Sequence, residues 1–345
     1  MRVVVTGASG NVGTALLRAL ARERPEWRVT GIARRPPHPE AGPPYDRVRW
    51  VSLDLASPDA VSGLRYALEG ADAVVHLAWA IQPSHQPAVM AAVNLDGTRH
   101  VVEAVLAAGV PHLVHASSLG TYAPVPRGRT PKPRVDESWP ATGVPASLYS
   151  RHKAVAERLL DGVEGPVVAR IRPGLVLQPV AGSEIGRYFL GPLAAGIRLA
   201  RAGLPVVPLP REMVADAVHA DDVADALVRI LDQRAGGAFN LAAEDPLSPP
   251  VIAEALRARW VPVPYTVLRG VLSASWYARV QPTDTGWLDL ARAVPLLDTG
   301  RARSELGWAP RHTAREALLA LTAAMSAGRG GRSPVLEPRA DQGTS

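Results

Sequence analysis

The chain has 345 residues, no cysteine and a formal net charge of +6. This length exceeds that of a usual single domain but is short for two independent ones, so we expect one large core with an appended lobe. The absence of cysteine excludes disulfides, thiolate catalysis and zinc–cysteine sites. No run reaches the roughly 18 apolar residues of a membrane span, so we expect a cytoplasmic protein without a membrane partner.

The positive charge is scattered along the chain, and only two of the 38 basic residues are lysines, Lys132 and Lys153. The densest basic stretch, 127–134, is rich in Pro and Gly and therefore does not read as a helix face. It also lacks the interleaved aromatic rings on which nucleic-acid bases stack. We therefore expect no nucleic-acid partner.

Over the first 120 residues, short apolar runs alternate with amphipathic segments. Strands are predicted at 2–5, 28–32, 48–53, 73–76 and 112–115, and helices at 12–22, 60–68 and 93–108. Alternation of this kind builds a parallel sheet with helices on both faces. The predicted strands are Val-rich and almost continuously apolar, which is typical of a sheet buried on both faces.

The second half of the chain is less regular. A Pro-rich loop is predicted over 123–147, followed by a helix at 148–160, a strand at 167–171 and a helix at 219–231 that Asp221 is placed to cap. Helices of a smaller lobe are predicted at 185–202, 250–258 and 265–277. The fold class is therefore α/β, a doubly wound parallel sheet with a smaller, mostly helical C-terminal lobe for the substrate.

A glycine-rich segment, TGASGNVG, joins the first predicted strand to the first helix. Gly7 permits a tight turn, Gly10 lets a diphosphate approach the backbone, and Gly13 allows the helix to pack closely on the strand. A plain glycine turn is the alternative, but the strand before and the helix after favour a dinucleotide site. The expected contacts in this loop are Gly7, Ser9, Gly10, Asn11 and Val12.

The second predicted strand ends in Ala33 and is followed by Arg34 and Arg35, where an NAD site usually has an acid for the ribose 2′-hydroxyl. An arginine can pair bidentately with a 2′-phosphate, so Arg34 favours NADP over NAD. The alternative is that both arginines are solvated loop charges. Asp54, after the third strand, is placed to meet the adenine edge or to serve as a plain turn residue.

Tyr149 and Lys153 are four residues apart and so share one face of a helix. A free tyrosine, with a pKa of about 10, is a poor base at neutral pH. A neighbouring ammonium and an oxidised nicotinamide would stabilise the phenolate and lower its pKa. Ser117 and Ser118 follow the fifth strand, from which a hydroxyl can reach the same substrate oxygen.

These motifs and their order resemble the extended short-chain dehydrogenases/reductases, the NAD-dependent epimerase/dehydratase family. The resemblance extends over about 1–325 and includes HLAW at 76–79, VNLDGT at 93–98, SSLGTY at 117–122, RPG at 172–174 and VHADD at 218–222. It implies a Rossmann-type dinucleotide-binding domain at 1–173, to which 216–242 returns. The substrate lobe would comprise 174–215 and 243–327. The Gly, Pro and charged residues of 328–345 predict a disordered tail.

The resemblance also implies roles for individual residues. The catalytic set would be Ser118, Tyr149 and Lys153. Further cofactor contacts would be Leu55, Leu77, Ala78, Trp79, Asn94, Lys153 and Pro173. The substrate would meet Trp79, Ser118, Leu119, Tyr149 and Leu175. A homodimer that pairs the helices at 93–108 and 148–160 is also expected by resemblance.

Departures from the family pattern indicate the substrate class. Leu119 and Gly120 stand where related dehydratases have an acidic pair, so elimination is disfavoured. Ala215 and the Trp287 stretch replace arginines with which nucleotide-sugar epimerases hold a diphosphate. A pocket lined in this way suits an apolar substrate.

Three functions remain open at this level. The first is an oxidoreductase that moves hydride between NADP(H) and a carbonyl or alcohol of an apolar molecule. The second is a nucleotide-sugar epimerase with tightly bound NAD, and the third is a non-catalytic NADP-sensing protein. No metal site is expected, because His219, Asp221 and Asp222 match a strand end and a helix cap better than a ligand set. His152 is expected to be exposed, and Trp79 to cover the nicotinamide or substrate or to pack in the core.

Overall fold

The computed structural model describes residues 1–81, 86–126, 131–185, 206–281 and 283–338. Its centre is a seven-stranded sheet in the order β3-β2-β1-β4-β5-β7-β11, in which every neighbouring pair is parallel. The strands are β1 (Arg2–Thr6), β2 (Arg28–Ala33), β3 (Val48–Ser52), β4 (Ala73–His76), β5 (His112–Ala116), β7 (Val167–Pro173) and β11 (Gly237–Leu241). The predicted Rossmann-type sheet is confirmed.

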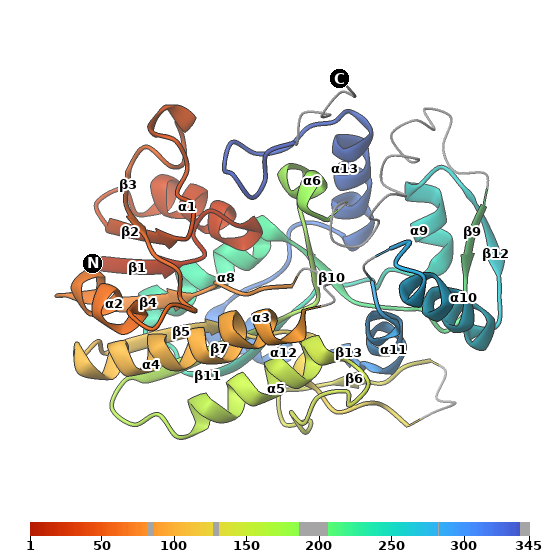
Figure 1. Cartoon of the computed structure of the whole chain (residues 1–345), viewed down its shortest axis with the longest axis horizontal. Coiled ribbons are helices and arrows are strands. Elements are labelled where there is room, and N and C mark those ends of the chain that lie inside the picture. Colours follow the sequence, from red (N-terminus) through yellow and green to blue (C-terminus); the bar gives the residue numbers. More distant parts are fainter. Residues whose placement is uncertain (82–85, 127–130, 186–205, 282, 339–345) are drawn as a thin grey trace.

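Helices cover both faces of this sheet (Figure 1). Successive strand residues point to opposite faces, so Val3 and Val5 join a core with α1 and α8, whereas Val4 joins a core with α2, α4 and α5. The helices are α1 (Asn11–Glu23), α2 (Ala60–Leu68), α4 (Gly97–Ala107), α5 (Leu148–Asp161) and α8 (Ala220–Gln233). Helix α3 (Pro87–Ala91) and a π-helical segment (Ala92–Asp96) lead into α4.

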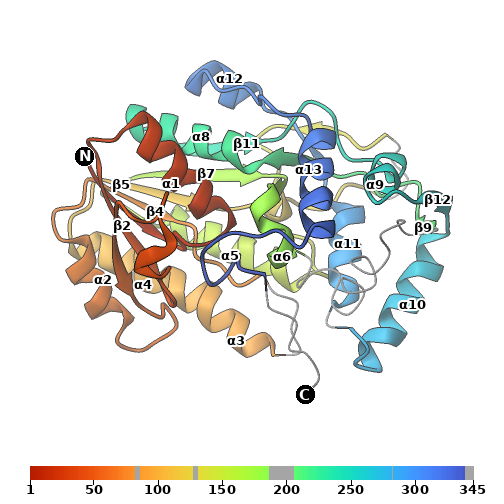
Figure 2. The same cartoon turned by 90° about the horizontal axis from the view of Figure 1, so that it is seen from above.

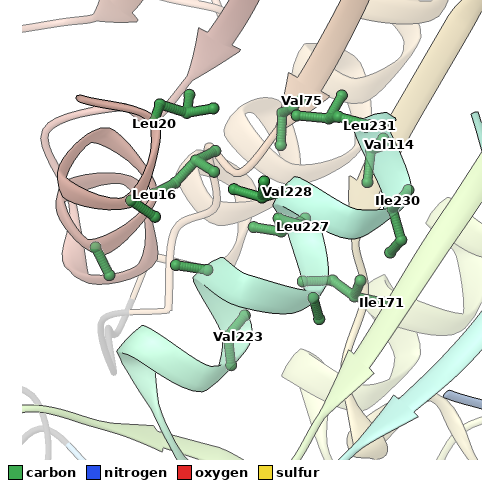
Figure 3. Packing of buried hydrophobic residues seen from close by; sticks show 14 of the residues in the cluster. Leu16, Leu20, Val75, Val114, Ile171, Val223, Leu227, Val228, Ile230 and Leu231 are labelled. Atoms are coloured by element: carbon green, nitrogen blue, oxygen red, sulfur yellow. The ribbon is translucent and has the colours of Figure 1, made fainter. Parts of the chain in front are cut away.

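The core between α1, α8 and the sheet is made of closely packed aliphatic side chains. Figure 3 shows Leu16 of α1 beside Val228 of α8, and Val75 and Val114 on strands of the sheet in the same cluster. All four side chains are at most 2% exposed. This packing fixes α1, and with it the glycine-rich loop at its N-terminus, against the sheet.

The smaller lobe is built from short parallel strand pairs and helices. The pairs are β6 (Arg134–Val135) with β13 (Leu296–Leu297), β8 (Leu175–Leu177) with β10 (Ala217–His219), and β9 (Val206–Leu209) with β12 (Arg259–Pro262). The helices of this lobe are α6 (Gly182–Ile185), α9 (Pro249–Ala255), α10 (Tyr265–Tyr277), α11 (Thr285–Ala293) and α13 (Ala314–Ser326). Helix α12 (Gly300–Leu306) instead packs against α8 and β11 and joins the core beside the central sheet. Most of the helix predicted at 185–202 lies outside the described residues. Where the chain is described, no helix is long and apolar enough to cross a bilayer.

The cap of α8 differs from the prediction. His219 is the N-cap residue, and its ring Nδ1 accepts a hydrogen bond from the Asp221 N–H at 3.1 Å. Asp221 lies within the first turn instead and pairs with Arg18 at 2.6 Å. The prediction failed because an imidazole placed two residues before a free N–H can accept its hydrogen bond as a carboxylate would.

The predicted disordered tail at 328–345 is also corrected. Residues 328–338 form a compact loop in which Ser333 and Leu336 are fully buried. The Gly331 N–H donates to the Leu336 carbonyl at 3.0 Å, so the loop closes on its own backbone. A composition of Gly, Pro and charge had suggested disorder, but one serine and one leucine are enough to bury its centre. Residues 339–345 lie outside the described part.

Candidate active site

The glycine-rich loop after β1 lies beside the segment after β4, at the point where the strand order of the sheet reverses. Gly7 has a φ of +69°, and a Cβ added to it would lie 2.7 Å from the Ala78 backbone nitrogen. A Cβ on Gly13 would lie 2.4 Å from the Gly7 carbonyl oxygen. Only glycines fit this cradle, and crevices of this kind receive dinucleotides in doubly wound sheets. The residues present therefore fit such a cofactor.

Asn94 holds the other side of the cradle. Its side chain is fully buried, accepts a hydrogen bond from the Ala80 N–H at 2.7 Å and donates to the Ala80 carbonyl at 3.0 Å. The Ala78 N–H in turn donates to the Thr6 hydroxyl at 3.3 Å. Asn94 therefore fixes the backbone that carries Leu77, Ala78 and Trp79.

The residues expected at the adenosine end lie at the edge of the sheet. The Arg34 guanidinium is 4.0 Å from the Asp54 carboxylate, and both side chains are well exposed. Asp54 also accepts a hydrogen bond from the Ala56 N–H at 3.0 Å, so it stabilises its own turn. Leu55 is 6% exposed and packs against Gly97. An exposed guanidinium at this edge is accessible to a phosphate.

The three predicted catalytic side chains come together at the ends of β5 and α5. The Lys153 ammonium lies 5.9 Å from the centre of the Tyr149 ring and donates to the Ala116 carbonyl at 2.7 Å. A Cβ on Gly120 would lie 3.0 Å from the Tyr149 ring and 3.4 Å from the Ser118 oxygen, so the missing side chain of this glycine leaves room for both. Ser147 caps α5 by accepting from the Ser150 N–H, which fixes where Tyr149 enters the site.

The neighbouring serines have different partners. The Ser117 hydroxyl donates to Glu157, whose carboxylate also receives two bonds from Arg172. Ser118 is held by a bond of 3.0 Å from the Gly120 N–H and lies beside Tyr149. Ser118 is therefore the serine whose hydroxyl faces the tyrosine.

Burial dominates the electrostatics of this site. It raises the pKa of Tyr149 to about 12, although a hydrogen bond with Ser118 opposes the shift. It holds the pKa of Lys153 well below its ordinary value, against the attraction of Glu157. The expected lowering of the Tyr149 pKa is therefore reversed in the protein alone, because burial penalises both charged forms. Tyr149 holds its proton at neutral pH.

Trp79 lies at the catalytic lysine. The Lys153 ammonium is 3.4 Å from the centre of its indole ring, and the ring of His115 meets it edge-on at 6.1 Å. The indole N–H is buried and has no hydrogen-bond partner among the described residues. Trp79 thus lies against Lys153 and His115, and its role as a cover for the nicotinamide or substrate stays a prediction.

Trp287 also touches the catalytic tyrosine. Its ring lies 4.9 Å from that of Tyr149, tilted by 34°, and projects from α11 of the smaller lobe. Both rings belong to an apolar cluster that includes Leu119. The sequence marked Trp287 only as a departure from the family pattern. Its position in a stretch that normally carries a substrate-binding arginine was the available signal.

The remaining predicted residues are placed as follows. Pro173 is buried at the end of β7, and Leu175 is 42% exposed on β8. His152, expected to be exposed, is only 6% exposed and lies 3.4 Å from the Asn94 side chain. This expectation was wrong because the neighbouring π-helical segment covers that face of α5.

The histidine and aspartates near α8 have structural partners. His219 stacks on His312 at 4.2 Å, and Asp222 accepts bonds from the Arg311 and His312 N–H groups. Within the described residues no group of three potential metal ligands converges.

Comparisons with known proteins agree with this geometry. The family model described as the NAD dependent epimerase/dehydratase family matches residues 3–242. An uncharacterized protein of Mycobacterium tuberculosis is 29% identical over 329 residues, which cover 94% of this chain but 30% of that protein. The chain therefore spans less than a third of that relative. The dTDP-6-deoxy-L-talose 4-dehydrogenase (NAD(P)(+)) of Kitasatospora kifunensis is 30% identical over 347 residues, covering 94% of this chain and 96% of the relative.

Among solved structures, the UDP-glucose 4-epimerase of Thermus thermophilus in complex with NAD superposes with a TM-score of 0.69 at 23% identity. The match covers 94% of this chain and 99% of the epimerase, and it establishes the shared fold. With the match to the family model, these findings confirm the family expected from the sequence motifs. The chain belongs to the NAD dependent epimerase/dehydratase family, the extended short-chain dehydrogenases/reductases.

Proposed function

We propose that this protein is an NAD(P)-dependent oxidoreductase that transfers hydride between nicotinamide and a carbonyl or alcohol of a fairly apolar small molecule. The observation that carries the proposal is the meeting of Ser118, Tyr149 and Lys153 beside the glycine cradle. Family membership supports the nicotinamide cofactor. The 4-dehydrogenase relative supports a net redox reaction.

The three catalytic residues have different tasks. Ser118 donates a hydrogen bond to the substrate oxygen, and Tyr149 donates its proton to the alkoxide that forms at that oxygen during reduction. Oxidation of the alcohol runs these transfers in reverse, so Tyr149 must then be a phenolate. Lys153 holds the ribose and, when charged, stabilises that phenolate. The bound nicotinamide supplies the hydride for reduction and accepts it for oxidation.

An apolar substrate is supported by what surrounds Tyr149. Trp287 lies against its ring, and Leu119 belongs to the same apolar cluster. Trp79 adds a second indole on the side of Lys153. Flat apolar walls bind rings and chains by burial and offer few donors to a diphosphate. Trp79, Leu119 and Leu175 are accordingly proposed as substrate contacts.

The cofactor preferred by this proposal is NADP. Arg34 is 63% exposed at the edge where the adenosine ribose lies in this fold, and its charge complements a 2′-phosphate. Asp54 is 4.0 Å from that guanidinium, and both side chains are exposed to solvent. Replacing Arg34 by Ala is expected to weaken NADPH binding while leaving NADH binding within about twofold, because NADH has no phosphate at this position.

We further propose a homodimer through the outer faces of α4 and α5, and a cytoplasmic location. Leu106 of α4 is 47% exposed and would be covered by the partner helix. Light scattering after size exclusion measures the mass directly. Replacing Leu106 by Glu should convert a dimer to a monomer.

The test combines a substrate screen with a matched pair of tyrosine variants. A panel of apolar ketones is screened with NADPH and NADH, and the best substrate is used to compare Tyr149→Phe with Tyr66→Phe. Tyr66 is 66% exposed and serves as the control. We expect Tyr149→Phe to lower kcat about 10²–10⁴-fold and the control to be unchanged.

The nucleotide released on denaturing the fresh protein distinguishes the alternatives. An empty site or bound NADP(H) agrees with an exchangeable cofactor. Stoichiometric NAD⁺, with no net reduction of any ketone, would instead indicate an epimerase. Exchangeable nucleotide with no turnover by the natural chain would indicate a sensing protein.

A further inference from the structure

The segment 329–338, which we call the strap, leaves α13 and reaches across to the start of α1. Figures 1 and 2 both show this segment extending from the end of α13 toward α1. Three internal bonds shape it, from the Gly331 N–H to the Leu336 carbonyl at 3.0 Å and from the Leu336 and Glu337 N–H groups to the Ser333 carbonyl at 2.9 and 2.8 Å. Leu336 is fully buried at its centre. The strap is therefore a packed element.

The strap contacts the glycine-rich loop. The Ser333 hydroxyl donates to the Ser9 carbonyl at 2.7 Å, and the two residues are 0% and 3% exposed. Arg332 also donates to the Ala41 carbonyl at 3.3 Å, on the connection between β2 and β3. The strap thus joins the two segments that flank the adenosine end of a dinucleotide in this fold.

The same loop is held from its other side by the smaller lobe. The Asn11 side chain donates to the Val176 carbonyl at 3.0 Å, and Gln178 donates to the Asn11 carbonyl at 2.7 Å. Ser9 and Asn11 are the two neighbours of Gly10. A loop that must present its N–H groups to phosphate needs a fixed backbone. The bond from Ser333 supports the loop from the side opposite to these contacts.

We propose that Ser333 is a positioning residue for dinucleotide binding: by holding the Ser9 carbonyl, it keeps the glycine-rich loop in its cofactor-binding conformation and slows cofactor release. This inference rests on the nicotinamide cofactor of the proposed function but not on any particular substrate. It goes beyond that function because Ser333 is 324 positions away from Ser9 in the chain. If the closed strap strengthens cofactor binding by a given free energy, bound cofactor must favour the closed strap by the same free energy.

The first experiment measures cofactor binding by the full chain. Ser333→Ala and Leu336→Ala are compared with Ser326→Ala, whose hydroxyl bonds within α13. Calorimetry gives Kd, and stopped-flow displacement gives the dissociation rate, for NAD(H) and NADP(H). We expect both strap variants to raise Kd and the dissociation rate about threefold to tenfold, because Ser333→Ala removes the bond to the Ser9 carbonyl and Leu336→Ala leaves a cavity in the strap that holds Ser333 in place. The kcat at saturating cofactor should stay within about twofold, and the control should match the natural chain.

A purely structural role would lower thermal stability without changing Kd or the dissociation rate, and that result would overturn the inference. Restoring cofactor affinity with Ser333→Thr, which keeps the hydroxyl, would support it further. If the natural chain bound none of these nucleotides, the proposed function itself would fail. If instead the natural chain and Ser333→Ala bound the nucleotide equally tightly, the inference about Ser333 would fail while the proposed function would stand.

The second experiment measures how often the strap opens, from its rate of cleavage by trypsin. Arg329 and Arg332 are exposed, so trypsin can cut there when the strap opens. Saturating cofactor should slow cleavage at these two positions by about the same factor by which Ser333→Ala raises Kd. Cleavage at an equal rate with and without cofactor, in a chain shown to bind it, would overturn the coupling.

Discussion

The indole of Trp79 covers the ammonium of Lys153, whose Nζ lies 3.4 Å from the centre of the ring. Together with the sheet beneath, this contact keeps Lys153 at 2% exposure and holds its pKa well below the ordinary value. Replacing Trp79 by Ala admits water to the ammonium. We expect the pKa of Lys153 to rise, because the gain in solvation outweighs the lost cation–π attraction of about 2 kcal/mol.

The chain is suited to this measurement because Lys132 and Lys153 are its only lysines. Lysine labelled with ¹³C at Cε gives two signals, which Lys132→Arg assigns. The signal of Lys132, whose pKa burial lowers to about 8, is the internal control and should not move in Trp79→Ala. An unchanged or lower Lys153 pKa would show that the indole does not shield the ammonium from water.

The protonation of Tyr149 predicts different pH profiles for the two directions of the reaction. Its raised pKa of about 12 keeps the phenol protonated between pH 6 and pH 9. The kcat for ketone reduction, which uses the phenol, should therefore be flat over this range. The kcat for alcohol oxidation, which uses the phenolate, should rise with pH. A reduction rate that fell through a midpoint near pH 7 would contradict this assignment.

Glu157 and Arg172 form a buried ion pair next to Ser117, the neighbour of the catalytic Ser118. Arg172 Nε lies 2.9 Å from one Glu157 oxygen, and the two side chains are 4% and 7% exposed. Glu157→Gln leaves the guanidinium without its charge partner in the interior, which should lower the free energy of unfolding by about 3–5 kcal/mol. Urea denaturation measures the loss.

The exposed pair of Arg315 and Glu254 provides a matched control for this experiment. Glu254→Gln should have little effect, because water already solvates both partners. If both variants lost the same free energy of unfolding, burial would not explain the contribution of the Glu157–Arg172 pair to stability.

The raised pKa of Asp216 predicts that the stability of the fold depends on pH. Burial raises its pKa to about 6, against the attraction of Arg134 and Lys132. Because its pKa is higher in the folded than in the unfolded chain, its stabilising effect is complete at low pH and is lost as pH rises from about 4 to 6. The natural chain should thus lose up to about 3 kcal/mol relative to Asp216→Asn over this window.

Thermal unfolding of both chains at pH 4, 5, 6 and 7 measures the difference. The comparison isolates Asp216 because every other carboxyl titrates in both chains. Parallel stability curves for the two chains would contradict the raised pKa.

Local sequence patterns predicted six of the seven strands of the central sheet, all but β11 (Gly237–Leu241). The Val-rich runs and the spacing of apolar residues in helices depend on neighbours a few positions apart, and so do the turns at Gly7 and Gly13. The pairing of Tyr149 with Lys153 is of the same kind, since four residues make about one helical turn. These features follow from backbone geometry and were therefore predictable.

Tertiary structure alone decided which distant side chains meet. The stacking of Trp79 on Lys153 and of Trp287 on Tyr149 joins segments that no local pattern relates. The balance of charges around Tyr149 depends on burial, and burial is a property of the packed chain. The same holds for Ser333, which lies in a segment whose composition suggested a disordered tail, although its hydroxyl bonds to the Ser9 carbonyl. The sequence by itself determined most strands and helices and which side chains can act as acid, base or hydrogen-bond donor. Packing determined how deeply those side chains are buried and what they touch. Desolvation and contacts between distant segments arise only once the chain has folded.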